Sequence, residues 1–282
     1  MTLNGVWQNE YGSQMSLTVY GGNLVYGTYS SSTGSTGKYM VIGYQQAADP
    51  TPAAGQAVAL AIEWHSIAGG SGDPSWNWSS GLSGQLSIQN GKESLVLAHA
   101  MVASSDFPGL CKAGTYIDKL TYARVSAKAE DLPARPDLAA PMADPLVGTW
   151  QSTDGSVALQ IQVYPYSPAL FGWVEGQLWL NGIVCPIEGV CDINAQSSGL
   201  TLESTGITAL PNSAGGPAIT FAGCLNFQNG ALTLLDLASL STAPDASYIQ
   251  TTATQLTFKR IGDVDAFDGH CQSNVAVPGL RW

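Results

Sequence analysis

The sequence predicts an all-β protein made of two eight-stranded antiparallel up-and-down β-barrels in tandem. Three observations favour this fold class. The chain has 32 glycines and only 11% charged residues, with few stretches that could carry a helical apolar stripe. Apolar residues recur at every second position, which is the period of a strand. The motif that opens the chain also occurs a second time near its middle.

The repeated motif starts with a glycine and a tryptophan and closes in a Gly-Ser turn. It runs from Gly5 to Ser13 and again from Gly148 to Ser156. Each copy has the size of a domain that can bury its own core. We therefore expect a first barrel over residues 1–125, a linker over 126–144, a second barrel over 145–262 and a C-terminal extension over 263–282.

Strand alternation in the first copy places apolar side chains on one face. Met15, Leu17 and Val19 form one such series, and Val58, Leu60, Ile62 and Trp64 form another. Turn signals separate the strands at the spacing of an antiparallel meander. They are Gly21-Gly22-Asn23, residues 30–37, 47–55 and 69–74, and Asn90-Gly91. A sheet of eight such strands loses its exposed edges by closing into a barrel, whose interior holds one small ligand.

The alternation stops between Ser126 and Pro145, where alanines and prolines follow neither structural period, as is typical of a linker. In the second copy we expect strands at Val157–Val163, Gly176–Val184, Leu200–Leu202 and Thr254–Arg260. The last of these echoes Leu120 to Arg124 in the first copy. The two copies therefore share an ending as well as a beginning.

Charge and hydropathy exclude several partners. The net charge is −11, from 10 Lys+Arg against 21 Asp+Glu, so the chain would repel a phosphate backbone and we expect no nucleic acid. No run approaches the length of a membrane-spanning helix, and the N-terminus lacks a charged and then apolar signal peptide. A secreted location is favoured over a cytoplasmic one. The five cysteines are an odd number, and buried thiols are favoured over a disulfide framework.

The first copy resembles the avidin and streptavidin family along most of its length. The resemblance is carried by short motifs in the family's order and spacing. They are Gly5-x-Trp7-x-Asn9-x-x-Gly12-Ser13, Gly27-Thr28-Tyr29-Ser30-Ser31, Lys38-Tyr39-Met40-Val41-Ile42-Gly43-Tyr44, Ala61-Ile62-Glu63-Trp64 and Leu82-Ser83-Gly84-Gln85. The resemblance implies a barrel with a biotin pocket and no other cofactor.

The resemblance also implies a set of ligand-binding residues. Asn9, Ser13 and Tyr29 match the three donors that converge on the ureido oxygen of biotin. Ser31 matches the serine that accepts a ureido N–H, and Ser80 matches a threonine near the ring sulfur. Trp64 matches one aromatic wall. Independently of the family, hydroxyls and an amide that face into a barrel need partners, so a polar ligand or ordered water is expected.

Other positions depart from the family pattern. Leu82 stands at a second wall tryptophan, and Ala100, or His99 in a shifted alignment, stands at a third. Leu120 stands at the expected aspartate, with Asp118 two residues earlier. Trp76 and Trp78 either replace the lost apolar surface or pin a loop. Residues 104–116 offer no match for the tryptophan that a neighbouring subunit supplies. We therefore expect an affinity below that of true avidins.

The second copy keeps little of the polar set. Ser152 replaces the asparagine, Val174 the tyrosine and Gly176 the serine, so that only Ser156 remains. Phe221 falls near a wall tryptophan and Leu256 at the aspartate. We expect this barrel to be a structural partner in an intrachain pseudo-dimer, with Trp173 or Trp179 covering the first pocket. Two chains could also pair as a homodimer.

No catalytic or metal site is predicted. The sequence has three histidines and no strict nucleophile motif, and His65 follows Trp64 directly, so it points away from the pocket as a solvated histidine. The tail from Asp263 resembles a calcium loop, but Phe267 and Asn274 occupy ligand positions. Two non-enzymatic functions stay open. One is binding of biotin or a related cyclic urea, and the other is a secreted toxin or interaction protein that uses the scaffold without biotin.

Overall fold

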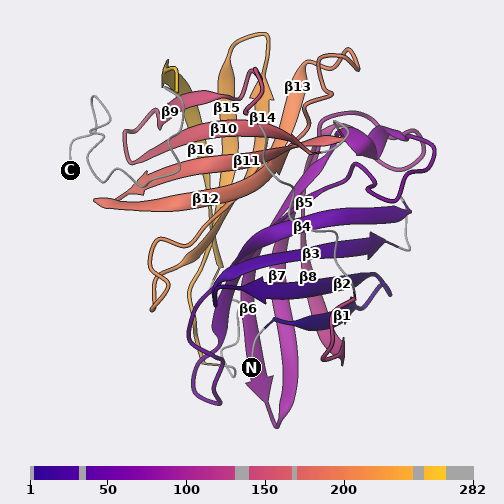
Figure 1. Cartoon of the computed structure of the whole chain (residues 1–282), viewed down its shortest axis with the longest axis vertical. Coiled ribbons are helices and arrows are strands. Elements are labelled where there is room, and N and C mark those ends of the chain that lie inside the picture. The colour runs from indigo at the N-terminus through magenta and orange to yellow at the C-terminus, as the bar shows by residue number, and fades with distance from the viewer. Residues whose placement is uncertain (1–2, 32–35, 131–139, 167–169, 244–250, 265–282) are drawn as a thin grey trace.

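The computed structural model describes residues 3–31, 36–130, 140–166, 170–243 and 251–264, and it consists of two closed β-barrels (Figure 1). Each barrel has eight antiparallel strands, and each strand pairs with its neighbours in the chain. The last strand pairs with the first to close the ring. The predicted fold class is confirmed.

The first barrel is built from strands β1 to β8. Their bounds are β1 Gly5–Asn9, β2 Gln14–Tyr20, β3 Leu24–Ser31, β4 Gly37–Gln45, β5 Gln56–Glu63, β6 Ser79–Gln89, β7 Lys92–Ala103 and β8 Gly114–Ser126. The single helical turn of the described residues, η1 Pro74–Asn77, lies between β5 and β6. No described helix has the length and apolar character needed to cross a lipid bilayer.

The second barrel repeats this order with strands β9 to β16. Their bounds are β9 Gly148–Ser152, β10 Val157–Tyr166, β11 Phe171–Leu180, β12 Ile183–Cys191, β13 Leu202–Ala209, β14 Ala218–Asn226, β15 Ala231–Ser239 and β16 Thr251–Gly262. Residues 131–139 of the expected linker lie outside the described residues. So do residues 265–282, with Cys271 and the calcium-like tail.

The period-two pattern has the predicted effect in both copies. Leu17, Val58, Leu60, Ile62 and Trp64 are all buried in the interior of the first barrel. A matching interior core fills the second barrel. The repeated tryptophan also has the same role twice. The indole N–H of Trp7 donates to the Leu3 carbonyl, and that of Trp150 donates to the Leu146 carbonyl, each at 2.9 Å.

Two strand predictions in the second copy were wrong. Gly176–Val184 is not one strand, because a hairpin turn at Asn181-Gly182 separates β11 from β12. Asn181 and Gly182 have φ of 50° and 78°, as an Asn-Gly hairpin turn requires. Asn90-Gly91, predicted as a turn, has φ of 50° and 72° and joins β6 to β7. The strand expected at Leu200–Leu202 begins at Leu202 and continues to Ala209.

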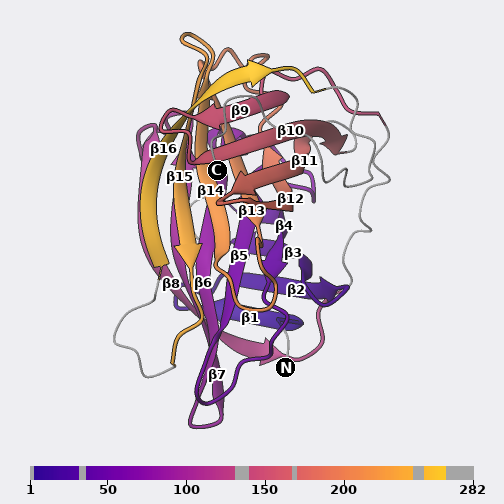
Figure 2. The same cartoon turned by 90° about the vertical axis from the view of Figure 1, so that its left-hand side faces the viewer.

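The barrels pack face to face through the outward sides of β4 to β7 and β12 to β15 (Figures 1 and 2). Thr220 Oγ1 donates to the Leu82 carbonyl at 2.8 Å, and Ser83 Oγ donates to Ser239 Oγ at 2.8 Å. Gly81 shows how close this contact is, since a Cβ at that position would lie only 2.5 Å from Thr220 Cγ2. The two barrels therefore form an intrachain pair, while pairing of two chains stays a prediction.

Candidate ligand-binding site

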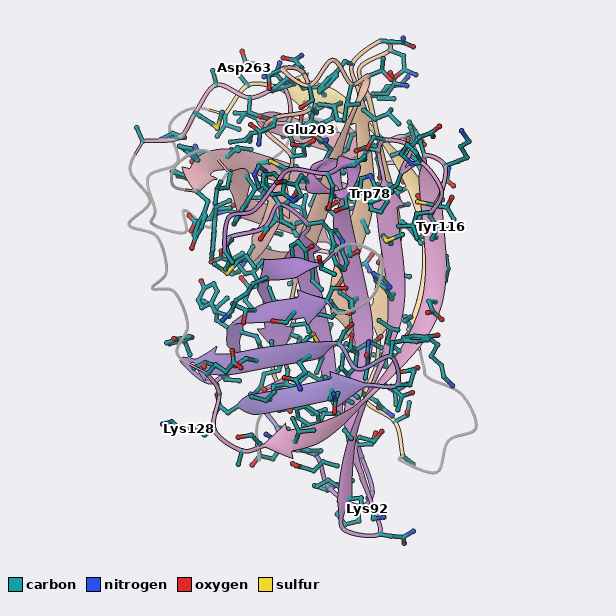
Figure 3. All side chains as sticks on the ribbon, turned by 90° about the vertical axis from the view of Figure 1, so that its right-hand side faces the viewer. Trp78, Lys92, Tyr116, Lys128, Glu203 and Asp263 are labelled. Carbon is teal, nitrogen blue, oxygen red and sulfur yellow. The ribbon has the colours of Figure 1, made fainter. Side chains whose placement is uncertain are left out.

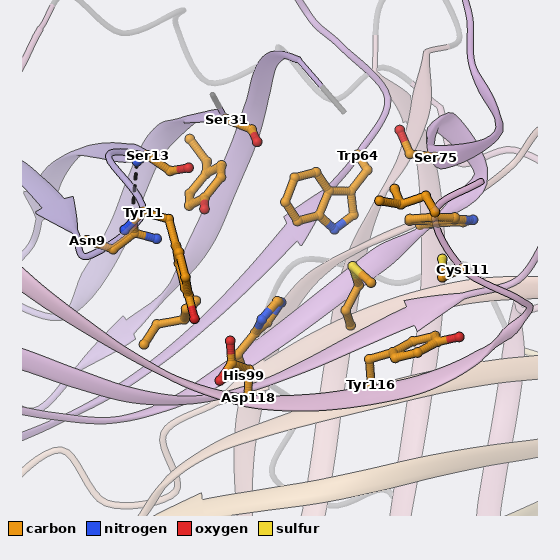
Figure 4. Close-up of a pocket in the computed structure, with 15 residues that line it drawn as sticks. Asn9, Tyr11, Ser13, Ser31, Trp64, Ser75, His99, Cys111, Tyr116 and Asp118 are labelled. Carbon is orange, nitrogen blue, oxygen red and sulfur yellow. Dashed lines mark hydrogen bonds between the residues drawn. The ribbon is translucent and has the colours of Figure 1, made fainter. Parts of the chain in front are cut away.

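The open end of the first barrel holds a cavity of about 490 Å³ (Figure 4). Among the described residues, those that line it all come from the first barrel and its loops. They are Asn9, Tyr11, Ser13, Tyr29, Ser31, Trp64, Ser75, Trp78, His99, Met101, Leu110, Cys111, Tyr116, Asp118 and Leu120. Five of the six predicted site residues lie on this one cavity, and Ser80 does not. Their role as ligand contacts stays a prediction.

Asn9 is the last residue of β1, and its side chain is held by the turn that follows. Asn9 Oδ1 accepts the backbone N–H of Ser13 at 2.9 Å and that of Tyr11 at 3.1 Å. Gly12, with φ of 84°, allows the chain to reverse there. Because the amide oxygen is engaged by the turn, the amide N–H₂ group is the end that can donate elsewhere.

Tyr122 lies beside Asn9 in the interior of the first barrel. Asn9 and Tyr122 are register partners across β1 and β8. The hydroxyl is buried without a hydrogen bond of normal geometry to any described residue. Burial is the main cause that raises its pKa well above the usual value, and the neighbouring Tyr29 and Asn9 also affect this pKa. These three side chains therefore form one cluster of buried polar groups.

Strand β3 supplies Tyr29 and Ser31, and β5 leads directly into Trp64. Tyr29 and Ser31 are two residues apart, so the pleat places both on the same face. The Tyr29 ring meets Trp64 edge to face, with centroids 5.5 Å apart and planes at 74°. The Tyr39 ring also packs against Trp64, with ring centroids 4.9 Å apart. The aromatic contacts hold one wall of the cavity in place.

Ser80 lies behind this wall and not on the cavity surface. It is fully buried, its Oγ accepts the indole N–H of Trp64 at 2.8 Å, and it lies 2.9 Å from His99 Nε2. Figure 4 shows Trp64 and His99 pointing toward each other. The family resemblance implies that this hydroxyl lies near the ring sulfur of biotin. In the structure it is engaged by two protein side chains. Ser80 fixes the wall from behind.

Of the two residues expected at the third wall position, His99 lines the cavity and Ala100 does not. The side chains of His99 and Met101 both face the cavity, whereas that of Ala100 points outward and packs against the second barrel. Burial lowers the pKa of His99 from 6.5 to about 4, against a smaller opposing effect of Asp118, its register partner on β8. The imidazole is therefore neutral at neutral pH.

The remaining wall is apolar and comes largely from loops. Trp78 is 2% exposed, and its indole N–H donates to Ser105 Oγ at 3.0 Å. Phe107 meets the Trp78 ring edge to face at 5.9 Å. Trp78 thus contributes apolar cavity surface. Trp76 does not line the cavity and belongs to the loop.

His65 differs from its predicted solvated role. It follows the end of β5, is half-buried, and stacks on Trp76 with ring centroids 4.2 Å apart. Burial lowers the pKa of His65 below its usual value. The histidine does not line the cavity, as expected. Trp76 and His65 together pin the loop between β5 and β6.

Several lining residues were missed from sequence. The strand period could have predicted Met101 as a lining residue, because it lies two residues after His99 on the same strand face. Leu110 and Cys111 lie between β7 and β8, where Phe107 and Cys111 form an isolated bridge. No periodic signal marks such a loop. Leu82, expected near a second wall, is fully buried in the interior core and does not line the cavity.

The idea that the second barrel covers this cavity was wrong. Trp173 packs against Tyr26 with ring centroids 5.4 Å apart, in the contact between the barrels, and its indole N–H donates to Glu188. Trp179 packs with Ala158 on the second barrel. Neither tryptophan lines the cavity. The second barrel supports the first from the side, at the sheet faces.

The corresponding polar groups of the second barrel are satisfied within the barrel. Ser152 Oγ donates to Asp154 Oδ1 at 2.6 Å, and Ser156 Oγ donates to the same oxygen at 2.8 Å. Val174 is buried in the interior core. At Gly176, which replaces the family serine, a Cβ would lie 1.8 Å from the Gln160 carbonyl oxygen.

Among the described cysteines, Cys185 and Cys191 are buried, whereas Cys111 and Cys224 are half-buried, so the expectation of buried thiols holds for two of the four. Cys111, Cys191 and Cys224 are free thiols, and Cys185 and Cys191 share the interior of the second barrel. Cys111 lies at the first cavity. Burial is the largest influence on the pKa of the Cys111 thiol and raises it above its usual value.

Comparison with known proteins points to one family. Residues 1–117 match the model described as the avidin family. A solved structure titled "Crystal structure of Xenavidin" is 20% identical in sequence, with a TM-score of 0.35. The match covers 44% of this chain and 97% of that chain. No curated protein matches this sequence.

Proposed function

The chain is a tandem of two avidin-like barrels, the first of which matches the avidin family over residues 1–117, and from this premise we propose that the first barrel binds biotin or a related cyclic urea. The observation that carries the proposal is the cavity itself. Asn9, Ser13, Tyr29 and Ser31 line it together with Trp64. Its volume of about 490 Å³ suits a small molecule.

A urea group would use the polar end of this cavity. The urea oxygen carries partial negative charge and would accept from the amide of Asn9 and the hydroxyls of Ser13 and Tyr29. Ser31 would accept one urea N–H. The oxygen of the Asn9 amide is already held by the turn, so its N–H₂ group needs no reorientation before binding. Donors held in place before binding cost less entropy on association.

The apolar part of the ligand would meet a reduced set of walls. Trp64 and Trp78 are aromatic, whereas Met101 and Leu120 supply flexible or smaller apolar surface. The loss of one buried aromatic anchor typically costs about 2 kcal/mol or more in binding. Ser80 does not reach the cavity and would act by holding Trp64. We therefore propose an affinity well below that of true avidins.

The proposed function is non-catalytic. The Ser80 hydroxyl and the His99 imidazole are in contact, but the hydroxyl also holds the Trp64 indole and does not line the cavity. A nucleophile must reach the bound molecule, and Ser80 lies behind the wall. This geometry supports binding and not reaction for the Ser80 and His99 pair.

Calorimetric titration of the full-length protein with biotin tests the proposal. We expect saturable heat with one site per chain. Tyr29→Phe and Ser31→Ala should each weaken binding by about 5- to 100-fold, since each leaves one polar group of the ligand without its partner. Tyr26→Phe is the matched control for the first change, because Tyr26 lies on β3 but faces the second barrel. Ser30→Ala, on the exposed face of β3, is the control for the second.

A second function stays open because Ser80 is engaged within the protein. The resemblance also places Leu82, and Ala100 or His99, where the family has two tryptophans. In that case the scaffold acts as an interaction protein that recognises another partner without biotin. Absence of heat at high biotin concentration, with the protein shown to be folded by circular dichroism, would favour this alternative and contradict the first proposal.

A further inference from the structure

The end of the second barrel near Glu203 contains three potential metal ligands. Cys191 is the last residue of β12 and Glu203 lies near the start of β13, while Asp144 precedes β9. One ligand atom of each, a carboxylate oxygen or Sγ, lies within 4.8 Å of the other two. Cys191 and Glu203 are 0% and 1% exposed, and Asp144 is half-buried. Figure 3 labels Glu203, and the Oγ of the next residue, Ser204, donates to the Asn77 carbonyl at 2.8 Å.

The hydrogen bonds around this cluster leave one buried carboxylate oxygen without a partner among the described residues. Asp144 Oδ1 accepts the backbone N–H of Leu146 at 2.8 Å. Glu203 Oε1 is buried without a hydrogen bond to any described residue. Asp192, next to Cys191, also has a buried oxygen without a partner, and so does Glu63, which belongs to the first barrel. The ion pairs of the described residues involve other acids. A buried carboxylate without a counter-charge is costly, so a bound cation would stabilise the ionised form of this cluster.

The first barrel shows how the same position is closed without acids. Gln45 ends β4 as Cys191 ends β12, and Gln56 begins β5 where Glu203 lies near the start of β13. Gln45 Oε1 accepts the backbone N–H of Leu3 at 3.0 Å, and its amide nitrogen donates to the Gly22 carbonyl. Gln56 donates to the Gln46 carbonyl at 2.8 Å. Neutral amides thus fill this position in one copy, although Gln56 Oε1 is buried without a partner among the described residues. Acids and a thiol take their place in the other copy.

We propose that Asp144, Cys191 and Glu203 bind one divalent cation of the Zn²⁺ class. A thiolate beside carboxylates favours Zn²⁺ over Mg²⁺ or Ca²⁺, which prefer oxygen ligands alone. Three protein ligands leave a fourth position for water. Spacings of up to 4.8 Å between ligand atoms require only small side-chain movements to close around an ion.

Binding of Zn²⁺ at this site would be coupled to proton release. Burial is the largest cause that raises the pKa of both Cys191 and Glu203, and neighbouring acids raise them further. A bound Zn²⁺ would displace the protons from Cys191 and Glu203, so binding should release protons and weaken as pH falls. The second barrel would then carry a structural ion, independent of any ligand in the first.

Titration of the reduced full-length protein with Co²⁺ tests the site, because thiolate coordination gives a charge-transfer absorption in the near ultraviolet. We expect this absorption to saturate at one Co²⁺ per chain and to disappear on addition of Zn²⁺. Cys191→Ser should abolish it. Glu203→Gln should weaken Zn²⁺ binding by about tenfold or more, measured by equilibrium dialysis. Zn²⁺ should also raise the unfolding temperature of the unmodified protein.

Cys185→Ser is the matched control, because Cys185 lies on β12 and faces the same interior but is outside the cluster. It should keep the absorption and the Zn²⁺ affinity. A second control, Cys271→Ala with His270→Ala, removes the potential ligands of the tail. If Cys191→Ser does not fold, Asp144→Asn at the half-buried edge provides the affinity measurement. Absence of the absorption in the unmodified protein, or its persistence in Cys191→Ser, would overturn the proposal.

Discussion

Asp236 occupies in the second barrel the interior position that His99 occupies in the first. Leu97 pairs with Leu120 and Leu234 pairs with Leu256, and in each barrel the titratable residue follows two positions later on the same strand face. Burial shifts the two pKa values in opposite directions. That of His99 falls to about 4 and that of Asp236 rises to about 6. The two copies should therefore respond to acid in opposite ways.

We expect His99 to destabilise the protein as the pH falls. Its folded pKa of about 4 lies below the ordinary 6.5, so its stabilising contribution is complete above about pH 6.5 and is lost as the pH falls to about 4. The shift corresponds to about 3 kcal/mol. Urea unfolding of the unmodified protein and His99→Gln across this range should show the variant losing less stability on acidification. A difference between the two proteins that does not change with pH would contradict this.

Asp236 should have the opposite effect. Its folded pKa of about 6 lies above 3.8, so its contribution is complete below about pH 3.8 and is lost as the pH rises through 6. Its Oδ1 is buried without a hydrogen bond to a described residue. The free energy of unfolding of Asp236→Asn should therefore rise relative to that of the unmodified protein between about pH 4 and 6, by about 2 to 3 kcal/mol. Above this range the difference should stay constant. The free energy of unfolding is measured by denaturant at each pH. If it changes with pH equally in both proteins, the pKa of the Asp236 carboxyl is not raised.

Removal of the Ser80 hydroxyl should cost stability. It accepts the buried indole N–H of Trp64 and contacts His99, so Ser80→Ala leaves both without a partner. We expect a loss of about 1 to 3 kcal/mol in the free energy of unfolding. The control is Ser79→Ala on the same strand, where the buried hydroxyl has no partner among the described residues. That change should be neutral or stabilising, and equal losses for the two variants would refute the role of Ser80.

Gly81 tests the contact between the barrels. A Cβ at this position would lie 2.5 Å from Thr220 Cγ2 and 2.9 Å from Ala222 Cβ. Gly81→Ala should therefore destabilise the chain by about 1 to 3 kcal/mol through overpacking. Thr220→Ser removes the clashing methyl group and keeps the hydroxyl that donates to Leu82. The double variant should recover part of the loss in thermal unfolding. An unchanged unfolding temperature in Gly81→Ala would place the barrels further apart than described.

The repeat and the strand period were enough to predict the architecture. A side chain that alternates along a strand must face either the interior or the outside, so Leu17, Leu60 and Trp64 could be placed without the structure. The resemblance to the avidin family, and not the strand period, predicted that Asn9 and Tyr29 would share one surface. Missing from that reading was the turn at Asn181-Gly182, although its residues carry a strong hairpin signal.

Only the tertiary structure decided how outward faces and loops are used. Period two shows that Trp173 points outward, but not that it packs against Tyr26 of the other barrel, since that depends on how two closed sheets dock. It also gives Ser80 an interior direction without showing that Trp64 and His99 engage its hydroxyl. Asp144, Cys191 and Glu203 come from three separate elements, and only barrel closure brings them together. Alternation is a local property of one strand, whereas contacts between distant strands depend on the packing of the whole chain.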